Sequence, residues 1–251
     1  MGYEEQKIEG RNAVLEAFRS GKTIDKLFVL DGCQDGPVRT IVREARKHDT
    51  IINFVDKERL DQLSETKKHQ GVIAMAAAFS YATVEDILEN ARKKNEAPFV
   101  ILLDNIEDPH NLGAILRTAE AAGFHGIILP KRRSASLNAT VAKTSAGAVS
   151  WVKVARVPNL VAAMEELKQN GIWIYGTDAA GTDYTQTDFR DGTAFVIGSE
   201  GNGMGRLVRE HCDQLLSLPM YGKVNSLNAS VAASIFMYEA VRQRRNPSGK
   251  P

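Results

Sequence analysis

The chain has 251 residues, of which 43% are hydrophobic and 25% are charged, an ordinary composition for a globular protein with a sizeable core. Its 32 basic residues nearly balance its 31 acidic ones. That balance excludes a purely electrostatic nucleic-acid binder, although a local basic patch remains possible.

The longest apolar run, residues 72–79, is far shorter than the roughly 20 residues that span a bilayer. Cys33 and Cys212 lack the spacing of a zinc site or a disulfide framework. The polar N-terminus does not resemble a secretory signal. We therefore expect a cytoplasmic protein with no membrane segment and no metal.

Residues 1–78 predict a small α/β domain, in which helices at 11–21, 38–49 and 57–65 alternate with strands at 26–30, 52–56 and 71–77. Residues 79–97 predict a polar linker helix, because Thr83 can cap it and Pro98 ends it.

Residues 98–246 alternate short apolar strands with helices, which predicts a second α/β domain built on a mostly parallel sheet covered on both faces. The strands are expected at 99–104, 126–130, 151–157, 172–177, 194–199 and 215–220, and the last helix at 226–245. Sheets of this kind bind ligands in the loops at the carboxyl ends of their strands. The basic end of the chain, "RQRRNPSGKP", is expected to be frayed, with residues 247–251 as a tail.

The stretch "DPHNLGAILRTAEAAGF" places Asp108 and Pro109 where a helix would begin. Small residues, including Gly113, surround Arg117 at helical spacing, which would leave its guanidinium accessible. The alternative is an ordinary surface arginine paired with Glu120. Four apolar residues of this helix are expected to face the sheet: Leu112, Ile115, Leu116 and Ala119.

The stretch "FVIGSEGNGMG" has four glycines after a buried strand, which permit unusual backbone angles and close approach to a ligand. It matches neither the GxGxxG dinucleotide fingerprint nor the GxxxxGK[ST] phosphate loop. Glu200 within it favours a cationic or hydroxyl-bearing ligand over a phosphate, because like charges repel. The alternative is a tight turn with a solvated glutamate.

The stretch "SLPMYGKVNSLNASVAASIF" gathers Asn225, Ser226 and Asn228 at the start of the last helix. N-capping would explain one of these polar residues, but not all three. The small residues that follow predict a helix packed tightly on both sides.

Together the three stretches resemble the three motifs of the SpoU–TrmH family of RNA ribose 2′-O-methyltransferases, which belongs to the SPOUT class. The front segment, with "IEGRNAVLEAF" and "KKHQGVIA", resembles that family's RNA-binding domain, similar to a ribosomal protein that binds kinked RNA. The two-part layout is most similar to enzymes that methylate a guanosine in 23S rRNA, and the close relatives that modify tRNA are built similarly.

The resemblance implies a Rossmann-like parallel sheet with a deep trefoil knot, a homodimer, and S-adenosylmethionine as methyl donor. It implies catalytic roles for Arg117, Asn111, Glu200 and Asn228. It implies a donor site that includes Thr177, Ile197, Gly198, Gly201, Leu218, Met220, Ser226 and Leu227.

The resemblance assigns Arg117 to the substrate hydroxyl. Arginine keeps its proton at ordinary pH, so we expect Arg117 to stabilise developing negative charge and to hold an RNA phosphate. The proton acceptor is left open between Arg117 and that phosphate. His110 is a tempting base, but we favour a packing or substrate-contact role for it.

The residues expected to contact rRNA, or tRNA, are Arg11 and Asn12 in the front domain and Lys131, Arg132 and Arg133 after a strand of the second domain. Lys67, Lys68 and His69 are further candidates. For each, the alternative is a solvated surface residue.

Two other classes of function are weighed against a methyltransferase. A non-catalytic rRNA-binding protein would explain the front domain but not the arginine, glutamate and asparagines at three strand ends. A nucleotide-dependent oxidoreductase would explain the α/β pattern, yet the glycine fingerprint is missing.

Overall fold

The computed structural model describes residues 6–77 and 79–246. The chain forms two compact units, residues 1–80 with 136–139 and residues 81–135 with 140–251. The domain boundaries at residues 78 and 97 stay predictions, and the predicted tail 247–251 lies outside the described residues. Within the described residues, no helix has both the length and the apolar character that crossing a bilayer would require.

The first unit is a four-stranded sheet in the order β1-β4-β2-β3, in which β2 and β3 are parallel and β4 runs antiparallel to β1 and β2. Its elements are β1 (Gln6–Glu9), α1 (Arg11–Arg19), β2 (Ile24–Leu30), α2 (Gly36–Lys47), β3 (Ile51–Val55), α3 (Lys57–Leu63) and β4 (Val72–Ala76). The predicted helices and strands are confirmed. Strand β1 was not predicted, because it is short and Ile8 is its one apolar residue.

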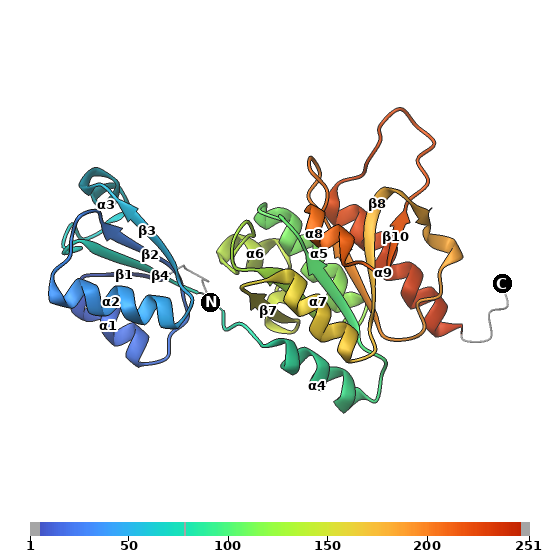
Figure 1. Cartoon of the computed structure of the whole chain (residues 1–251), viewed down its shortest axis with the longest axis horizontal. Coiled ribbons are helices and arrows are strands. Elements are labelled where there is room, and N and C mark those ends of the chain that lie inside the picture. The colour runs from blue at the N-terminus through green and yellow to red at the C-terminus, as the bar shows by residue number, and fades with distance from the viewer. Residues whose placement is uncertain (1–5, 78, 247–251) are drawn as a thin grey trace. The chain divides into compact units, whose positions relative to one another are not determined.

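The helices of the first unit lie on both faces of its sheet (Figure 1). Buried side chains of α1 and α2, among them Val14, Phe18 and Ile41, form one core with Leu27 and Val29 of β2. Helix α3 lies on the opposite face. The apolar positions of α1 and α2 recur at helical spacing, so their burial against a strand follows from the sequence pattern.

The second unit is a six-stranded sheet in the order β10-β8-β9-β5-β6-β7, with every neighbouring pair parallel. The predicted parallel α/β fold is therefore confirmed. Its elements are α4 (Val84–Lys94), β5 (Phe99–Leu103), α5 (Pro109–Ala121), β6 (Gly126–Pro130), α6 (Ala139–Thr144), η1 (Ala148–Ser150), β7 (Lys153–Val157), α7 (Leu160–Gln169), β8 (Trp173–Asp183), η2 (Tyr184–Gln186), β9 (Thr193–Ile197), α8 (Arg206–Glu210), β10 (Gln214–Ser217) and α9 (Ala229–Arg245).

Helices cover both faces of this sheet. Apolar residues of α4, α7 and α8 share one core with alternate residues of the central strands, such as Val100 and Val196. On the other face, Phe195 of β9 packs against Phe236 of α9, with the ring centroids 5.7 Å apart and the ring planes tilted by 39°. Helix α4, in the segment predicted as a linker, has the predicted Thr83 cap but belongs to the core of the second unit.

Helix α9 differs from its prediction at its far end and along one face. It stays helical to Arg245, because Arg244 is fixed by hydrogen bonds to the carbonyl oxygens of Phe189, Ala97, Pro98 and Asp191. Burial lowers the pKa of Arg244 to about 10. The expected fraying is therefore wrong up to Arg245. The prediction that α9 is packed tightly on both sides is also wrong for the single chain, because Val231 and Tyr238 of this helix are 47% and 50% exposed.

Helix α5 follows β5, one of the two central strands, and has the predicted buried face. Its residues Leu112, Ile115, Leu116 and Ala119 are at most 1% exposed. Gly113 serves a different purpose from the one predicted. A Cβ atom at Gly113 would lie 1.8 Å from Oγ1 of Thr144 and 3.0 Å from the backbone nitrogen of Ser145. The glycine therefore lets α5 approach the end of α6, rather than clearing space around Arg117.

Replacing Gly113 with alanine should lower the free energy of unfolding by about 1–2 kcal/mol, because overpacking against Thr144 outweighs the gain in helix propensity. Urea unfolding of the full chain measures this change. Gly222→Ala is the matched control, since nothing lies within 4 Å of the added methyl group. Equal stability of the two variants would contradict the packing role of Gly113.

Candidate active site

The first motif begins α5 as predicted. The Asp108 side chain accepts a hydrogen bond of 3.0 Å from the backbone N–H of His110, and Pro109 is the first helical residue. This cap fixes the first turn, which follows the carboxyl end of β5. Asn111 lies in that turn and is half-buried. Because β5 pairs with β9, this position brings the Asn111 amide within reach of the loop that follows β9.

The glycine-rich loop closes on itself at the end of β9. Ser199 and Gly203 exchange two backbone hydrogen bonds of 3.1 and 2.9 Å. A Cβ atom at Gly198 would lie 2.3 Å from the carbonyl carbon of Gly203, and Gly203 has a φ of 62°. At least these two glycines are therefore required by the loop's own turn, and the turn presents Glu200 at its tip.

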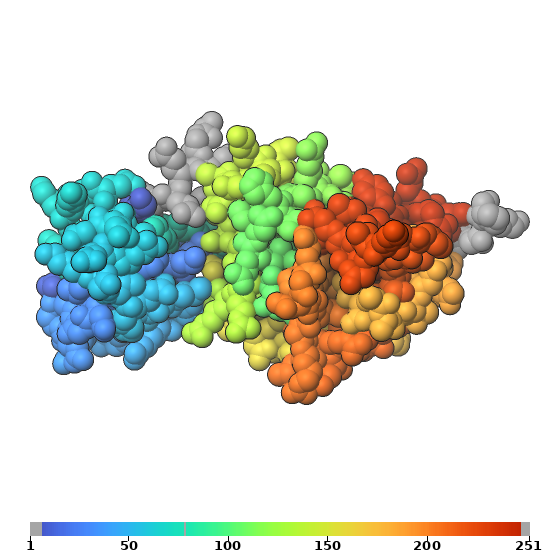
Figure 2. All heavy atoms as spheres, turned by 90° about the horizontal axis from the view of Figure 1, so that it is seen from above, coloured from blue at the N-terminus to red at the C-terminus, as the bar shows by residue number. Residues whose placement is uncertain are grey.

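Glu200 connects the three motifs. Its Oε1 accepts hydrogen bonds from Nδ2 of Asn111 at 3.1 Å, from Nδ2 of Asn228 at 2.6 Å and from the backbone N–H of Ala229 at 3.3 Å. Nδ2 of Asn228 also donates to Oδ1 of Asn111 at 2.9 Å. In the space-filling view the green, orange and red segments that carry these residues adjoin one another (Figure 2). Three stretches far apart in sequence thus meet at one carboxylate oxygen.

Asn228 has two functions at once. Its Oδ1 accepts hydrogen bonds from the backbone N–H groups of Ser230 and Val231, which caps α9. Its Nδ2 is directed to Glu200 and Asn111. The capping alternative is therefore correct for Asn228, but it accounts only for the oxygen of the side-chain amide and not for its nitrogen.

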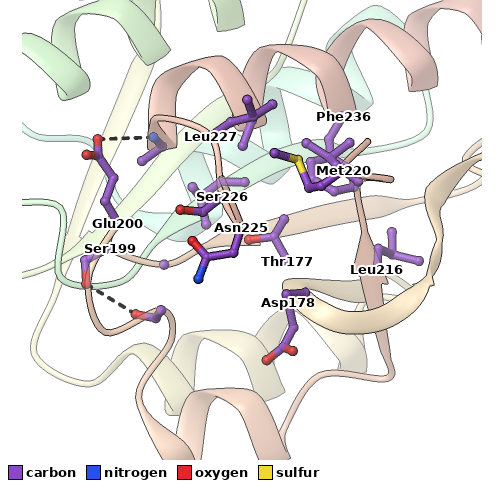
Figure 3. A pocket seen from close by; sticks show the side chains of 17 residues that line it. Thr177, Asp178, Ser199, Glu200, Leu216, Met220, Asn225, Ser226, Leu227 and Phe236 are labelled. Atoms are coloured by element: carbon purple, nitrogen blue, oxygen red, sulfur yellow. Dashed lines mark hydrogen bonds between the residues drawn. The ribbon is translucent and has the colours of Figure 1, made fainter. Parts of the chain in front are cut away.

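A pocket of about 350 Å³ opens beside Glu200 at the carboxyl ends of β8, β9 and β10. Leu216, Met220 and Phe236 lie on one side of it and Ser199 and Glu200 on the other (Figure 3). Most of the residues predicted for the donor site line this pocket, namely Thr177, Ile197, Gly198, Leu218, Met220, Ser226 and Leu227. Gly201 is not among the lining residues. Their roles remain predictions.

Part of the pocket wall was missed because β8 is longer than predicted. Its register with β10 shifts between the pairs Gly176–Leu215 and Thr182–Leu216, so the intervening residues leave the regular ladder, and Asp178 and Ala179 of that stretch line the pocket. A hydrogen bond from Arg209 lowers the pKa of Asp178.

Three residues of α9 that were not predicted for the site, Ala229, Ala232 and Phe236, also line the pocket. Ala232 and Phe236 stand three and seven positions after Ala229. That helical spacing was the available signal, because residues at such intervals share one face of a helix.

Arg117 is not brought into contact with this cluster. It is exposed on α5 and does not line the pocket. Within residues 6–77 and 79–246 it makes no ion pair or hydrogen bond, so the alternative pairing with Glu120 is absent there too. His110 is likewise exposed. The single chain therefore unites Asn111, Glu200 and Asn228 but not Arg117.

The residues predicted to contact RNA have mixed surroundings. In the first unit, Arg11 is held by Asp35 at 2.6 Å and by the carbonyl oxygen of Gln70 at 3.0 Å, while Asn12 is exposed. His69 is buried, and its ring nitrogens contact Asp61 and the backbone N–H of Gly71, which is a structural role.

In the second unit, the segment Lys131–Arg133 follows β6 directly. Arg132 and Arg133 are exposed, whereas the backbone of Lys131 continues the pairing with β7 through a 2.8 Å hydrogen bond from its N–H to the carbonyl oxygen of Val157. RNA contact by these residues stays a prediction.

Two family models match the chain. The model of the SpoU rRNA Methylase family matches residues 98–238. The model described as RNA 2′-O ribose methyltransferase substrate binding matches residues 7–82.

Among similar proteins, one from Bacillus subtilis named as a TrmH family tRNA/rRNA methyltransferase, YacO, is 49% identical over the whole of both chains. One of the same family name from Staphylococcus saprophyticus is 48% identical, covering 96% of this chain and 97% of its own. Among solved structures, the SpoU methyltransferase AviRb from Streptomyces viridochromogenes in complex with AdoMet has a TM-score of 0.61 and 27% identity, with 96% of this chain and 91% of that chain covered.

The two functions of Asn228 can be separated by substitution. Asn228→Ala should lower the free energy of unfolding by about 1 kcal/mol through loss of the cap, whereas Asn228→Ser should restore most of it, because serine also caps helices. Neither variant keeps the amide that reaches Glu200. Urea unfolding of both variants measures the effect, and an Asn228→Ser protein as unstable as Asn228→Ala would contradict the capping contribution.

Proposed function

Because this chain belongs to the SpoU rRNA methylase family and is an S-adenosylmethionine-dependent RNA methyltransferase, we propose that it methylates the ribose 2′-hydroxyl of a guanosine in 23S rRNA. The observation that carries the proposal is the cluster of Asn111, Glu200 and Asn228 beside a pocket at three strand ends. The match of residues 7–82 to a 2′-O ribose methyltransferase substrate-binding model supports the choice of hydroxyl. A tRNA guanosine is the second candidate, because the similar proteins are named for tRNA and rRNA alike.

The pocket suits the donor on chemical grounds. S-adenosylmethionine has a flat adenine, ribose hydroxyls and a sulfonium cation, and when bound it supplies an electrophilic methyl group. The apolar side of the pocket, with Leu218, Met220 and Phe236, would hold the adenine. Asp178 and Glu200 add carboxylates that suit the hydroxyls and the cation. We extend the proposal to the trefoil knot that the resemblance implied for this part of the chain.

The protein's own contribution would be alignment and charge stabilisation. Holding donor and acceptor in attack geometry is worth roughly 7–11 kcal/mol. We propose that Asn111, Glu200 and Asn228 orient the ribose and its surroundings, since their hydrogen bonds already fix one another in place. A guanidinium that contacts the hydroxyl and an adjacent phosphate would favour the developing alkoxide.

Arg117 is the residue proposed for that guanidinium, and a second copy of the chain would have to supply it, because Arg117 lies outside its own chain's pocket. A homodimer fits the half-exposed Val231 and Tyr238 of α9, the helix whose other face lines the pocket. A two-fold dimer would form two such composite sites.

The donor and the modified position can be tested directly. Calorimetry should detect binding of S-adenosylhomocysteine but not of NAD or ATP. Incubation with labelled S-adenosylmethionine should methylate unmodified 23S rRNA, and mass spectrometry should locate the label on one guanosine ribose. Label found only in tRNA would make tRNA the substrate in place of 23S rRNA. Binding of RNA without any methyl transfer would favour the non-catalytic RNA-binding alternative.

Substituting Arg117 should abolish transfer without affecting the donor. We expect Arg117→Ala to reduce the rate by about 10²–10³-fold, in the range for loss of one transition-state donor, and Arg117→Lys to lose most activity with its bidentate geometry. S-adenosylhomocysteine affinity should be unchanged in both. Full activity of Arg117→Lys would contradict the assignment.

Co-expression of Arg117→Ala and Asn228→Ala chains tests where Arg117 acts. If the arginine serves the partner's pocket, mixed dimers contain one intact composite site and recover part of the activity. If each chain uses its own Arg117, every site in the mixture lacks one group and no activity returns.

A further inference from the structure

The first unit has a groove beside α2 that none of the residues predicted for RNA contact lines. It encloses about 380 Å³ between α2 and the strand β3. Val38, Val42 and Phe54 give it an apolar lining, and Arg39, Arg43 and Arg46 give it a cationic one. We call these six residues the arginine–aromatic groove.

Phe54 is unusual for its position. It is 53% exposed, although a phenylalanine gains most when it is buried. It stands two residues after Ile52, which packs against the core shared with α2, so both side chains point to the same face of the sheet. Strand β3 is at the edge of the sheet. An aromatic ring is thus presented beside α2 with much of its surface open to solvent.

The three arginines share one face of α2, because they stand four and three residues apart. All are exposed. Within the described residues, Arg43 and Arg46 have no hydrogen bond or ion pair, and Arg39 has a 3.4 Å hydrogen bond to Gln34. Repulsion among like charges at this spacing disfavours the helix.

The nearby groups do not account for this charge. Glu44, the acidic residue within α2, lies 3.8 Å from Lys47 instead. The helix dipole favours cations in the last turn, which accounts for Arg46. It does not account for Arg39, which lies near the positive end of the helix. A ligand of opposite charge would explain an arrangement that is unfavourable to the helix by itself.

We propose that the arginine–aromatic groove binds an unpaired segment of the RNA substrate, with one base stacked on Phe54 and the neighbouring phosphates on Arg39, Arg43 and Arg46. This inference rests on the proposed function, which makes RNA the substrate. Stacking on an aromatic ring and contact with a row of cations are the two elements of single-strand recognition. A duplex cannot offer a base to the ring without unstacking.

Binding of the full chain to a fluorescein-labelled oligouridine, measured by fluorescence anisotropy without methyl donor, tests the proposal. Phe54→Ala should weaken binding about tenfold, as expected for loss of one stacked base, and Phe54→Trp should retain it. In the Phe54→Trp protein, RNA should quench the introduced tryptophan. Arg39→Ala with Arg43→Ala should weaken binding and lower the slope of log affinity against log salt by roughly 1.4, or about 0.7 for each lost phosphate contact on a single strand.

Arg59→Ala is the matched control. It removes one positive charge from α3, against two in the double groove variant, on the opposite face of the sheet, where Arg59 contacts Gln62. It should leave both the affinity and the salt slope unchanged. An equal loss in this control, unchanged binding in the folded groove variants, or equal affinity for a duplex of the same length would overturn the proposal. So would binding of the groove to anionic vesicles with no affinity for the oligouridine. The binding assay measures no methyl transfer. Its result can therefore be interpreted even if the methylation assay fails.

Discussion

One carboxylate oxygen holds the candidate site together. Oε1 of Glu200 accepts hydrogen bonds from the side chains of Asn111 and Asn228 and from the first backbone N–H of α9. The positive end of the α9 dipole favours the charge at that position. Glu200 is exposed, so water screens these contacts and their contribution to stability is modest. Their main effect is positional, because they fix the start of α5, the glycine-rich loop and the start of α9 against one another.

The sheet and its last helix supply the rest of that rigidity. Parallel strands end at a common edge, which places three loops within reach of one pocket. Helix α9 is capped by Asn228 at one end and fixed near the other by Arg244, which binds four backbone carbonyl groups. A pocket wall held at both ends loses little freedom when a ligand binds, and such preorganisation favours both affinity and alignment.

The sequence predicted those parts of the molecule that depend on local pattern. Apolar strands, helix starts such as Asp108–Pro109 and the cap at Thr83 all have short-range chemical signals, and the structure has them. The role of Gly113 could not be predicted from the sequence, because Thr144, the residue whose side chain requires a glycine there, is distant in sequence. Isolation of Arg117 from its own pocket was unpredictable for a similar reason, since helical spacing identifies a residue's neighbours within the helix but not what lies opposite it.

The departure of β8 from its regular ladder has a consequence for how this pocket tolerates change. The strand pairs with β10 before and after the interruption, at Gly176 and again at Thr182, and the stretch between them forms part of the pocket wall. Substitutions at Asp178 and Ala179, which line the pocket, would reshape the cavity while both anchoring stretches kept their partners. Gly181 is different, because a Cβ atom there would lie 2.6 Å from the backbone of Leu215 and Leu216. The shape of the pocket and the pairing of the sheet therefore depend on different residues of this one stretch.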